Sequence, residues 1–442
     1  MEECVFEYEK NDGGVTLKKF LSGGEEVVIP EYARDAGGLT GLPVTRIAPE
    51  CFKENGIMIT RIVVPETVKV LENDAFAYCV SLQELLLPDT IEVLGADYLI
   101  ASGLEEAYIP AGVNVIERPE LIDRRFIVSP DNKCFSSDGF GLYETKNGNK
   151  TLVAVNASDV RDHYCIEANT VRISPGALRD ISTLKRMHIP AELDIIEEGS
   201  LSFTGGRATG SCGLEDITVA SGNKRFLIKY DCLCERVGDG SLKLIRFFGG
   251  KCCAPGQDVA RIGRGCFKNT RLEQITFLRD DISIGEEAFS GCLLSYAYTP
   301  SGSIFFGEED QFVTEDFVTE FGKNGKLYDY RVYDDFLETE YLTEPRVRMI
   351  CHRLQNPAGL CSESVSHLRS KMTGQMRDII ELLAQEHNCT TLGDLGELGF
   401  FTSDNIDEYI QLTVELEEKE MTAWFMSYKN SNIGFSDDLG YL

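Results

Sequence analysis

The sequence predicts a protein of mixed α and β class, in which a β-solenoid of short parallel strands with β-hairpin insertions precedes an all-α C-terminal domain. Two observations support this prediction. A phrase of about 22 residues recurs between Val44 and Pro300, and it combines β-branched residues, a small residue with Phe, a Leu and an apolar strand that ends in Pro. After about residue 305 the apolar residues follow a period near 3.6, which is typical of helices.

The recurring phrase defines the coils of the predicted solenoid. Its period lies within the range of about 20–29 residues that is typical of leucine-rich repeats. The copies read VTRIAPECF…ITRIVVP (44–65), VKVLENDAFAYCVSLQELLLP (68–88), VRISPGALRDISTLKRMHIP (171–190), VARIGRGCFKNTRLEQITFL (259–278) and ISIGEEAFSGCLLSYAYTP (282–300). Because no single coil can bury its apolar face, we expect successive coils to stack.

The last residues of each coil predict a short strand with two faces. In the coil that ends at Pro88, Leu85 and Leu87 point to one face, while Glu84 and Leu86 point to the other. Pro88 has no N–H group and therefore ends the strand. The core opposite the strands is filled by the Phe positions of the coils, namely Phe52, Phe76, Phe267 and Phe289.

The chain divides into three predicted parts. Residues 1–43 alternate apolar and polar side chains around Gly-containing turns, and they predict an N-terminal β cap over the open end of the solenoid. Residues 44–304 hold the leucine-rich repeats, in which stretches near 126–155 and 217–248 predict β-hairpin insertions. Residues 305–442 predict an acidic all-helical domain, since 27 acidic and 11 basic side chains follow residue 300.

Start and stop signals indicate about five or six helices in the C-terminal domain. Helix starts are predicted at Thr314, Ser362 and Thr402, because each is followed by an acidic residue in the first turn. Breaks between helices are predicted at Asn356-Pro357 and from Gly393 to Gly399.

Several motifs of the repeat region occur together in a fixed order. The coils follow the pattern V-x-x-I-G-x-x-A-F-x-x-C-x-x-L-x-x-I-x-I-P, with GGVTL…VVIP…GLPVTRI before them and SSDG-x-LY…TL within them. In these motifs, over roughly residues 5–300, the chain resembles the BspA-type leucine-rich repeats, a bacterial family. Residues 91–125 depart from the pattern, because they keep the strand that ends at Pro110 and lose the Phe. The resemblance implies adhesion or glycan binding at the cell surface as one function.

The net charge of −29 at pH 7 narrows the classes of partner. Phosphate contacts need clustered Lys and Arg, so we expect no nucleic-acid partner. No stretch approaches about 18 continuous apolar residues, and MEECVFEYEKNDGG at the start has neither the basic nor the apolar region of a signal peptide. The sequence therefore predicts a cytoplasmic location without membrane insertion, with display at the cell surface as the alternative.

The fifteen cysteines predict neither a disulfide framework nor a metal site. A disulfide framework is typical of short secreted domains, and this chain is long. The closest pairs, Cys232/Cys234 and Cys252/Cys253, lack the spacing of a zinc site. Other cysteines precede or follow the Phe of a coil, where a thiol acts as a small apolar side chain. We therefore predict no metal and no cofactor.

Two of the five histidines lie close in sequence to a cysteine and are candidates for a Cys/His nucleophile pair. They are His163, near Cys165, and His352, next to Cys351. Neither pair has the surrounding motif of a known cysteine hydrolase. His352 lies beside two arginines in a helical pattern, which predicts a solvated helix face. The sequence predicts no catalytic residue and no enzyme; an enzyme with its site in the helical domain is the third hypothesis.

The outward face of the strands is the predicted binding surface, because extended repeats commonly bind through such a face. Counting back from each Pro, the outward pairs are Arg61/Val63, Glu84/Leu86, Glu106/Tyr108, Arg186/His188, Asp216/Thr218, Gln274/Thr276 and Tyr296/Tyr298. The predicted partner-binding residues are the amphipathic rings among them, Tyr108, His188, Tyr296 and Tyr298. The alternative is that strand propensity alone explains these rings.

The sequence thus predicts a non-enzymatic scaffold for protein–protein interaction. Its partner is expected to be a protein or peptide, bound through the sheet face of the repeats or through the helical domain. An adhesion or glycan-binding protein at the cell surface is the alternative.

Overall fold

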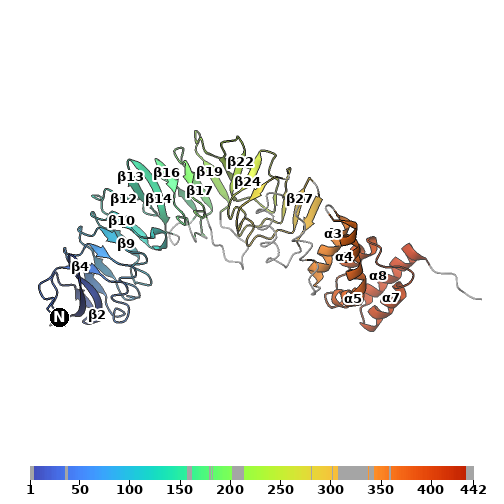
Figure 1. The fold of residues 1–442 in the computed structure, drawn as a ribbon, viewed down its shortest axis with the longest axis horizontal. Coiled ribbons are helices and arrows are strands. Elements are labelled where there is room, and N and C mark those ends of the chain that lie inside the picture. Colours follow the sequence, from blue (N-terminus) through green and yellow to red (C-terminus); the bar gives the residue numbers. More distant parts are fainter. Residues whose placement is uncertain are drawn as a thin grey trace, which may run out of the picture. The chain divides into compact units, whose positions relative to one another are not determined.

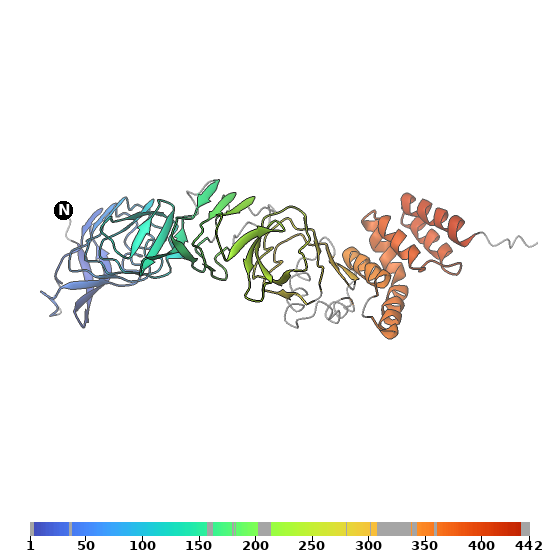
Figure 2. The ribbon, with the colours of Figure 1, turned by 90° about the horizontal axis from the view of Figure 1, so that it is seen from above.

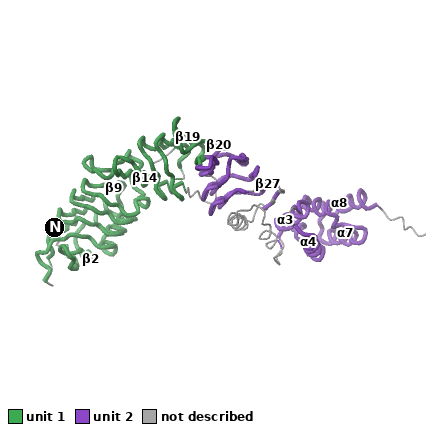
Figure 3. The backbone as a smooth tube through the Cα atoms, turned by 45° about the horizontal axis from the view of Figure 1, so that its top comes forward, with its two compact units in different colours: residues 1–229, 233–236 green, residues 230–232, 237–442 purple. Residues whose placement is uncertain are grey.

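The computed structural model, drawn in Figure 1 and from above in Figure 2, describes residues 4–34, 38–156, 162–178, 181, 183–201, 214–279, 281–300, 302–306, 337, 343–357 and 360–434. The chain forms two compact units, shown in Figure 3. Unit 1 comprises Met1–Lys229 and Leu233–Arg236, and unit 2 comprises Tyr230–Cys232 and Val237–Leu442.

Unit 1 begins with an antiparallel hairpin of β1 (Val5–Asn11) and β2 (Gly14–Ser22), which matches the alternation read from the sequence. Gly14 is required where the hairpin meets the first coil, because a Cβ atom there would lie 2.2 Å from the carbonyl oxygen of Pro43. β2 then pairs in parallel with β4 (Val44–Ile47), so the hairpin continues into the stacked coils.

Parallel strands of unit 1 form two rows, since each coil contributes one short strand to each row. Row A follows the order β2-β4-β6-β8-β10 and adds β6 (Val70–Leu71), β8 (Val93–Leu94) and β10 (Val115–Ile116). Row B contains β3 (Glu26–Val28), β5 (Arg61–Val63), β7 (Glu84–Leu86), β9 (Glu106–Ile109) and β11 (Arg125–Val128). Within row B, β3-β5-β7 form one sheet and β9-β11 form another. The short turn η1 (Pro119–Leu121) separates β10 from β11.

The stretch predicted as the first insertion begins with β11, which pairs in parallel with β9. β12 (Phe135–Ser137), β13 (Gly141–Lys146) and β14 (Asn149–Val155) follow as antiparallel neighbours. Asn147 and Gly148 join β13 to β14 with φ angles of 53° and 80°, which is the conformation of a two-residue hairpin turn. β14 itself pairs with the next coil, so part of this hairpin belongs to row A.

The two-row arrangement resumes after this hairpin in new sheets. On the row A side, β16 (Thr170–Ile173) and β18 (Ile195–Ile196) follow β14, and on the row B side β15 (His163–Cys165), β17 (Arg186–Ile189) and β19 (Asp216–Val219) form a sheet of their own. Among the described strands, row B is therefore also interrupted between β11 and β15. β20 (Phe226–Lys229) ends the main segment of unit 1, and the boundary between the units crosses β21 (Cys232–Arg236).

Unit 2 repeats the two-row arrangement. Its row A consists of β22 (Leu242–Phe247), β24 (Val259–Ile262) and β26 (Ser283–Ile284) in parallel. Its row B consists of β23 (Cys252–Cys253), β25 (Gln274–Thr276) and β27 (Tyr296–Thr299), to which β28 (Gly302–Phe305) is added antiparallel.

Buried Phe side chains stack from coil to coil in the core, as the repeated phrase predicts. In unit 1, the ring centroids of Phe20, Phe52 and Phe76 are separated by 5.4 Å at each step. In unit 2, the steps from Phe247 to Phe267 and from Phe267 to Phe289 are 5.3 and 4.9 Å. These rings are almost fully buried, so each coil depends on its neighbours for its core.

Six α-helices lie in the described residues from 343 to 434, grouped after the strands of unit 2 (Figure 2). They are α3 (Glu344–Gln355), α4 (Ser362–Gly374), α5 (Met376–Gln385), α6 (Thr390–Glu397), α7 (Ile406–Glu415) and α8 (Lys419–Tyr428), followed by the π-helical turn η2 (Lys429–Ile433). Among the described residues, none of these helices has the length and apolar content needed to cross a membrane.

The helix boundaries confirm part of the prediction and correct part of it. α4 begins at the predicted Ser362, α3 ends before Asn356-Pro357, and the start predicted at Thr314 lies outside the described residues. The start predicted at Thr402 is early, because α7 begins at Ile406 after a turn in which the Ile406 N–H bonds the Thr402 carbonyl.

The break predicted from Gly393 to Gly399 is correct only at its end. α6 runs through Gly393 and Gly396 and ends at Glu397, before Gly399 with a φ of 74°. A Cβ atom on Gly396 would lie 2.6 Å from Cε2 of Tyr428, whose hydroxyl donates to the Gly396 carbonyl oxygen. This glycine therefore allows α8 to pack closely on α6, and it does not end the helix.

Candidate functional site

Row B of unit 1 presents two columns of outward side chains. The sheet β3-β5-β7 and the sheet β9-β11 are each in register, so equivalent side chains line up from coil to coil. The charged column consists of Glu26, Arg61, Glu84, Glu106 and Arg125. The apolar column, two residues further along each strand, consists of Val28, Val63, Leu86, Tyr108 and Ile127. The outward direction predicted for these positions agrees with their exposure.

The charges of the charged column alternate in sign except at one place. Arg61 Nε lies 2.5 Å from Glu84 Oε2, and Arg125 Nη1 lies 3.6 Å from Glu106 Oε1. Between these two pairs, Glu84 and Glu106 occupy neighbouring coils with the same negative charge. A positive charge between Glu84 and Glu106 is therefore missing from the alternation of the column.

The ladder of row B is interrupted at the same place. β7 belongs to the sheet with β3 and β5, while β9 belongs to the sheet with β11. In the described part of the chain no backbone hydrogen bond joins β7 to β9. The same two coils stay joined in row A, where β6, β8 and β10 pair without a break. The coils therefore remain stacked, and only their row B edges separate.

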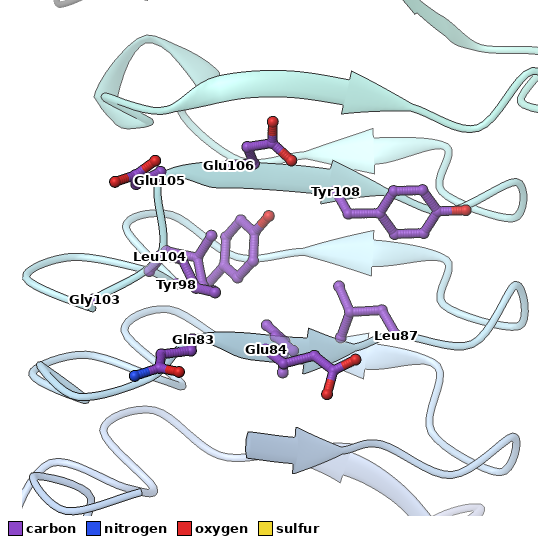
Figure 4. Close-up of a pocket in the computed structure, with 11 residues that line it drawn as sticks. Gln83, Glu84, Leu87, Tyr98, Gly103, Leu104, Glu105, Glu106 and Tyr108 are labelled. Carbon is purple, nitrogen blue, oxygen red and sulfur yellow. The ribbon is translucent and has the colours of Figure 1, made fainter. Parts of the chain in front are cut away.

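A cleft of about 450 Å³ occupies this interruption (Figure 4). Its volume lies in the range of sites that bind small ligands or side chains. Apolar side chains of Leu85, Leu87 and Leu104 line it and stay partly exposed. Three carboxylates, two hydroxyls and one amide also line it, those of Glu84, Glu105, Glu106, Tyr98, Tyr108 and Gln83. The cleft thus combines an apolar lining with an acidic rim.

Tyr98 brings a buried hydroxyl to the cleft, and Figure 4 shows its ring between β7 and β9. The residue is fully buried, and its hydroxyl has no hydrogen-bond partner among the described residues. Burial raises the pKa of this phenol above its ordinary value, so the hydroxyl stays protonated. A buried polar atom without a partner is costly, and it is suited to bind a ligand group that enters the cleft.

Comparison of the coils explains why Tyr98 is unusual. In seven coils one position follows a residue with positive φ and precedes the large apolar residue of the core. This slot holds only small residues in the other coils, namely Cys51, Ala75, Ala177, Ser200, Cys266 and Ala288. Tyr98 occupies the slot after Asp97, and Leu99 takes the place of the Phe. Sequence reasoning noticed the missing Phe and missed Tyr98, which aligning the slot across all coils would have revealed.

The structure separates the four residues predicted to bind a partner. Tyr108 lies on β9 at the rim of the cleft, and His188 lies on β17, where its Nδ1 is 2.8 Å from Oγ1 of Thr218. Tyr296 and Tyr298 lie on β27 in unit 2, with their rings stacked at 6.0 Å. Tyr108 is the one of the four that lines the cleft, and a binding role for each stays a prediction.

A second polar cluster lies on β15, β17 and β19. Cys165 Sγ is 3.2 Å from Nε2 of His163, and Cys165 pairs in register with His188. The structure therefore brings this Cys/His pair into contact, which sequence proximity alone did not establish. Among the described residues, no three His, Cys, Asp or Glu side chains are grouped as a metal ion would require.

The solvated helix face predicted around His352 is wrong. The imidazole packs against the rings of Tyr296 and Phe305, each at 5.9 Å, and its Nε2 is 3.3 Å from Ser303 Oγ. Burial lowers the pKa of His352, and Asp394 opposes this effect.

The neighbours of His352 do not face solvent either. Arg353 is buried and donates to the Asn356 carbonyl oxygen, while the Arg348 guanidinium lies 4.9 Å above the Phe305 ring. Burial also raises the pKa of Cys351 to about 12, so this thiol is a core group. These residues therefore attach α3 to β27 and β28.

Known proteins similar to this chain share its repeat region. Residues 43–120 and 254–319 match the family described as the BspA type leucine rich repeat region, in six copies. This match confirms the resemblance drawn from the motifs. None of the curated proteins compared with the chain matches it.

Solved structures similar to this chain are bacterial repeat proteins. A leucine rich cell surface protein from Faecalibacterium prausnitzii is 16% identical, covers 71% of this chain and 98% of its own, and has a TM-score of 0.35. The pneumococcal vaccine antigen PcpA is 16% identical over 68% of this chain and 71% of its own, with a TM-score of 0.34. A leucine-rich repeat protein from Bacteroides capillosus is 28% identical over 29% of this chain and 99% of its own, with a TM-score of 0.25.

Proposed function

Because the chain carries BspA-type leucine-rich repeats, we propose that it binds a protein partner through row B of unit 1, without catalysing a reaction. The interruption between β7 and β9 is the observation that supports this proposal most directly. Strand edges with unpaired backbone groups are surfaces to which extended segments of other proteins add. The apolar column beside the cleft adds contact area, since Val28, Leu86 and Tyr108 are 53%, 40% and 38% exposed.

Site-specific photocrosslinking tests this proposal in the full-length chain. A photoreactive phenylalanine analogue replaces Leu86 in the apolar column, or Val414 on α7 as a matched control, because both side chains are exposed. After irradiation in an extract of the cells that make the protein, we expect a discrete adduct at position 86 and none at position 414. An adduct at 414 alone would assign binding to the helical region and contradict the proposal.

Glycan binding is the second candidate function, and one observation in unit 2 favours it. Tyr296 and Tyr298 stack with an interplanar angle of 10°, and Tyr298 is 37% exposed, so together they offer a flat aromatic surface to a sugar ring. Binding of the full-length chain to a glycan array that is lost on Tyr298→Ala would support this function. Binding that the substitution leaves unchanged would exclude this aromatic surface as the glycan site.

The location of the protein also stays a proposal. We propose the cytoplasm, in keeping with the sequence analysis, and display at the cell surface is the alternative. Fractionation of the native cells followed by immunodetection separates the two. Recovery of the chain with the surface fraction would contradict the cytoplasmic proposal.

A further inference from the structure

The row B edges of β7 and β9 direct unbonded backbone groups into the cleft. The Glu84 N–H donates to the Thr60 carbonyl oxygen, and the Leu86 carbonyl oxygen accepts from the Val64 N–H, so both residues face β5. Because successive residues of a strand face opposite edges, the N–H and C=O groups of Leu85 face β9.

The facing edge of β9 follows from the same rule. The carbonyl oxygens of Glu105 and Ile109 accept from the N–H groups of Arg125 and Ser129, so these carbonyls face β11. The backbone groups of Glu106 and Tyr108 therefore face β7. Among the residues that the structure describes, neither set of groups is bonded across the cleft, so an extended segment can bond to either edge.

The charges at the cleft select the side chain that such a segment must carry. Glu84 and Glu106 each have one arginine on the far side, and within the described part of the chain no ion pair joins either of them to a cation on the side of the cleft. A cationic side chain between them restores the alternation of the charged column. Glu105 at the same rim adds a third carboxylate.

The lining of the cleft fits the rest of such a side chain. The aliphatic stem of Lys or Arg packs well on apolar surface while its charged end reaches polar groups. Leu85, Leu87 and Leu104 supply the apolar surface. The buried hydroxyl of Tyr98 supplies an acceptor for an N–H donor that passes the rim.

We propose that the cleft between β7 and β9 receives an arginine or lysine side chain from an extended segment of the partner. The residue two positions along that segment is apolar and lies on the apolar column, next to Leu86 and Tyr108. This inference rests on the proposed function and adds the chemistry of the partner to it.

Two labelled peptides test the charge requirement with the full-length protein. The first is a fluorescein-labelled peptide of alternating threonine and valine with one central arginine. The second replaces the arginine by citrulline, which keeps the shape and removes the charge. Fluorescence anisotropy is expected to show about tenfold weaker binding of the citrulline peptide, because charge-assisted hydrogen bonds to carboxylates are lost. Equal binding of both peptides would overturn the proposal.

Protein variants then assign the charge effect to the cleft. Glu106→Gln removes a carboxylate at the cleft, and Glu92→Gln removes an equal charge at a carboxylate that pairs with Lys69 outside it. We expect Glu106→Gln to weaken binding of the arginine peptide about fivefold and Glu92→Gln to change it less than about twofold. If both variants weaken binding equally, the peptide responds to the overall negative charge of the chain. That result would contradict a specific site for arginine in the cleft.

The variant Tyr98→Phe tests whether the Tyr98 hydroxyl binds the ligand or stabilises the fold. Removing an unpaired buried hydroxyl is expected to keep or raise the midpoint of thermal unfolding of the free protein, while the arginine peptide binds about threefold more weakly. A lower midpoint with unchanged binding would show that the hydroxyl serves the fold.

The proposed function and this inference can fail separately. If crosslinking at position 86 succeeds and the unchanged protein binds both peptides alike, the partner uses row B without a cation in the cleft. If the arginine peptide binds as expected and no adduct forms at position 86, the cleft accepts a cationic side chain and the proposed binding of a protein partner in the extract is wrong.

Discussion

In unit 2, row B pairs without a break from β23 to β27, whereas in unit 1 the same row separates between β7 and β9. The slot before the core Phe holds Cys266 and Ala288 in unit 2, and it holds Tyr98 in the interrupted coil. A ring in a slot built for a small residue needs additional room. The comparison indicates that one residue can open the edge of a repeat while row A keeps the coils together.

The interrupted coil differs in length from the coil before it, whereas it matches the coils of unit 2, in which eight positions also separate Cys266 from Gln274 and Ala288 from Tyr296. The slot residues Ala75 and Tyr98 are 23 positions apart, while the strand-ending Pro88 and Pro110 are 22 apart, so the segment between slot and strand is one residue shorter. Gly103 lies in this segment and donates its N–H to the Cys79 carbonyl oxygen. At Gly103 this segment lies close to the backbone of Val80 and Leu82 in the coil before it, which is why a glycine is required there.

Substitutions in the cores of the two units are expected to give the largest difference in the free energy of unfolding. Phe267→Ala removes a ring that stacks on both sides, and it should lower the free energy of unfolding by about 3–5 kcal/mol. Leu99→Ala removes a buried side chain that lines the existing cleft, so its loss should be nearer the lower limit of about 2 kcal/mol.

Urea unfolding followed by circular dichroism measures both changes. Leu278→Ala is the control, because this leucine is 48% exposed and its loss should change the free energy of unfolding by less than about 0.5 kcal/mol. Equal losses for Phe267→Ala and Leu99→Ala would mean that the two coils are equally packed. This result would contradict looser packing in the coil that contains Tyr98.

A smaller effect is expected at the glycine of the shortened coil. A Cβ atom on Gly103 would lie 2.5 Å from the carbonyl oxygen of Val80 and 2.7 Å from that of Leu82. Gly103→Ala should therefore force the two coils apart and lower the free energy of unfolding by about 1–3 kcal/mol. Gly238→Ala is the matched control, because no heavy atom lies within 4 Å of its added Cβ. Similar urea midpoints for the two variants would argue against close contact at Gly103.

The repeated phrase was sufficient to predict the row B strands, because the information that defines them is local. The row A strands, such as β6 (Val70–Leu71), were not predicted, since each coil was expected to contribute one strand. Alternation around Leu85 and the Pro at the end of each coil predict where a strand lies and which side chains face outward. The interruption of row B could not be predicted in this way, because the residues of the coil that ends at Pro110 still favour a strand. The interruption depends on how Tyr98 packs against the preceding coil, and the sequence of one repeat alone does not contain that information.

The helical region shows the same limit. The sequence predicts a break from Gly393 to Gly399 because glycine often ends helices, yet Gly396 lies within α6 and its role depends on Tyr428, 32 residues later. His352 was predicted to face solvent because its neighbours in sequence are arginines, yet Phe305 and Tyr296 cover it. In both cases the deciding partner is distant in sequence, and local patterns carry no information about it.

The smallest effect is a pH dependence at this attachment of α3 to the strands of unit 2. Burial holds the pKa of His352 below its ordinary value, with Arg353 acting in the same direction and Asp394 against it. Between the folded pKa and the ordinary value of about 6.5, the unfolded chain binds more protons than the folded chain. The contribution of the neutral imidazole to stability is therefore complete above about pH 6.5 and is lost as the pH falls toward the folded pKa.

His352→Phe keeps a ring against Tyr296 and Phe305 and removes the titrating group. Its free energy of unfolding should consequently fall less than that of the unchanged protein between about pH 7 and 5. The single tryptophan, Trp424 on α8, packs on Phe401 and Tyr428, so its fluorescence during urea unfolding reports the helices selectively. If the two proteins lose stability equally over this range, His352 titrates as a solvated side chain, and its contacts with the strands do not hold its pKa down.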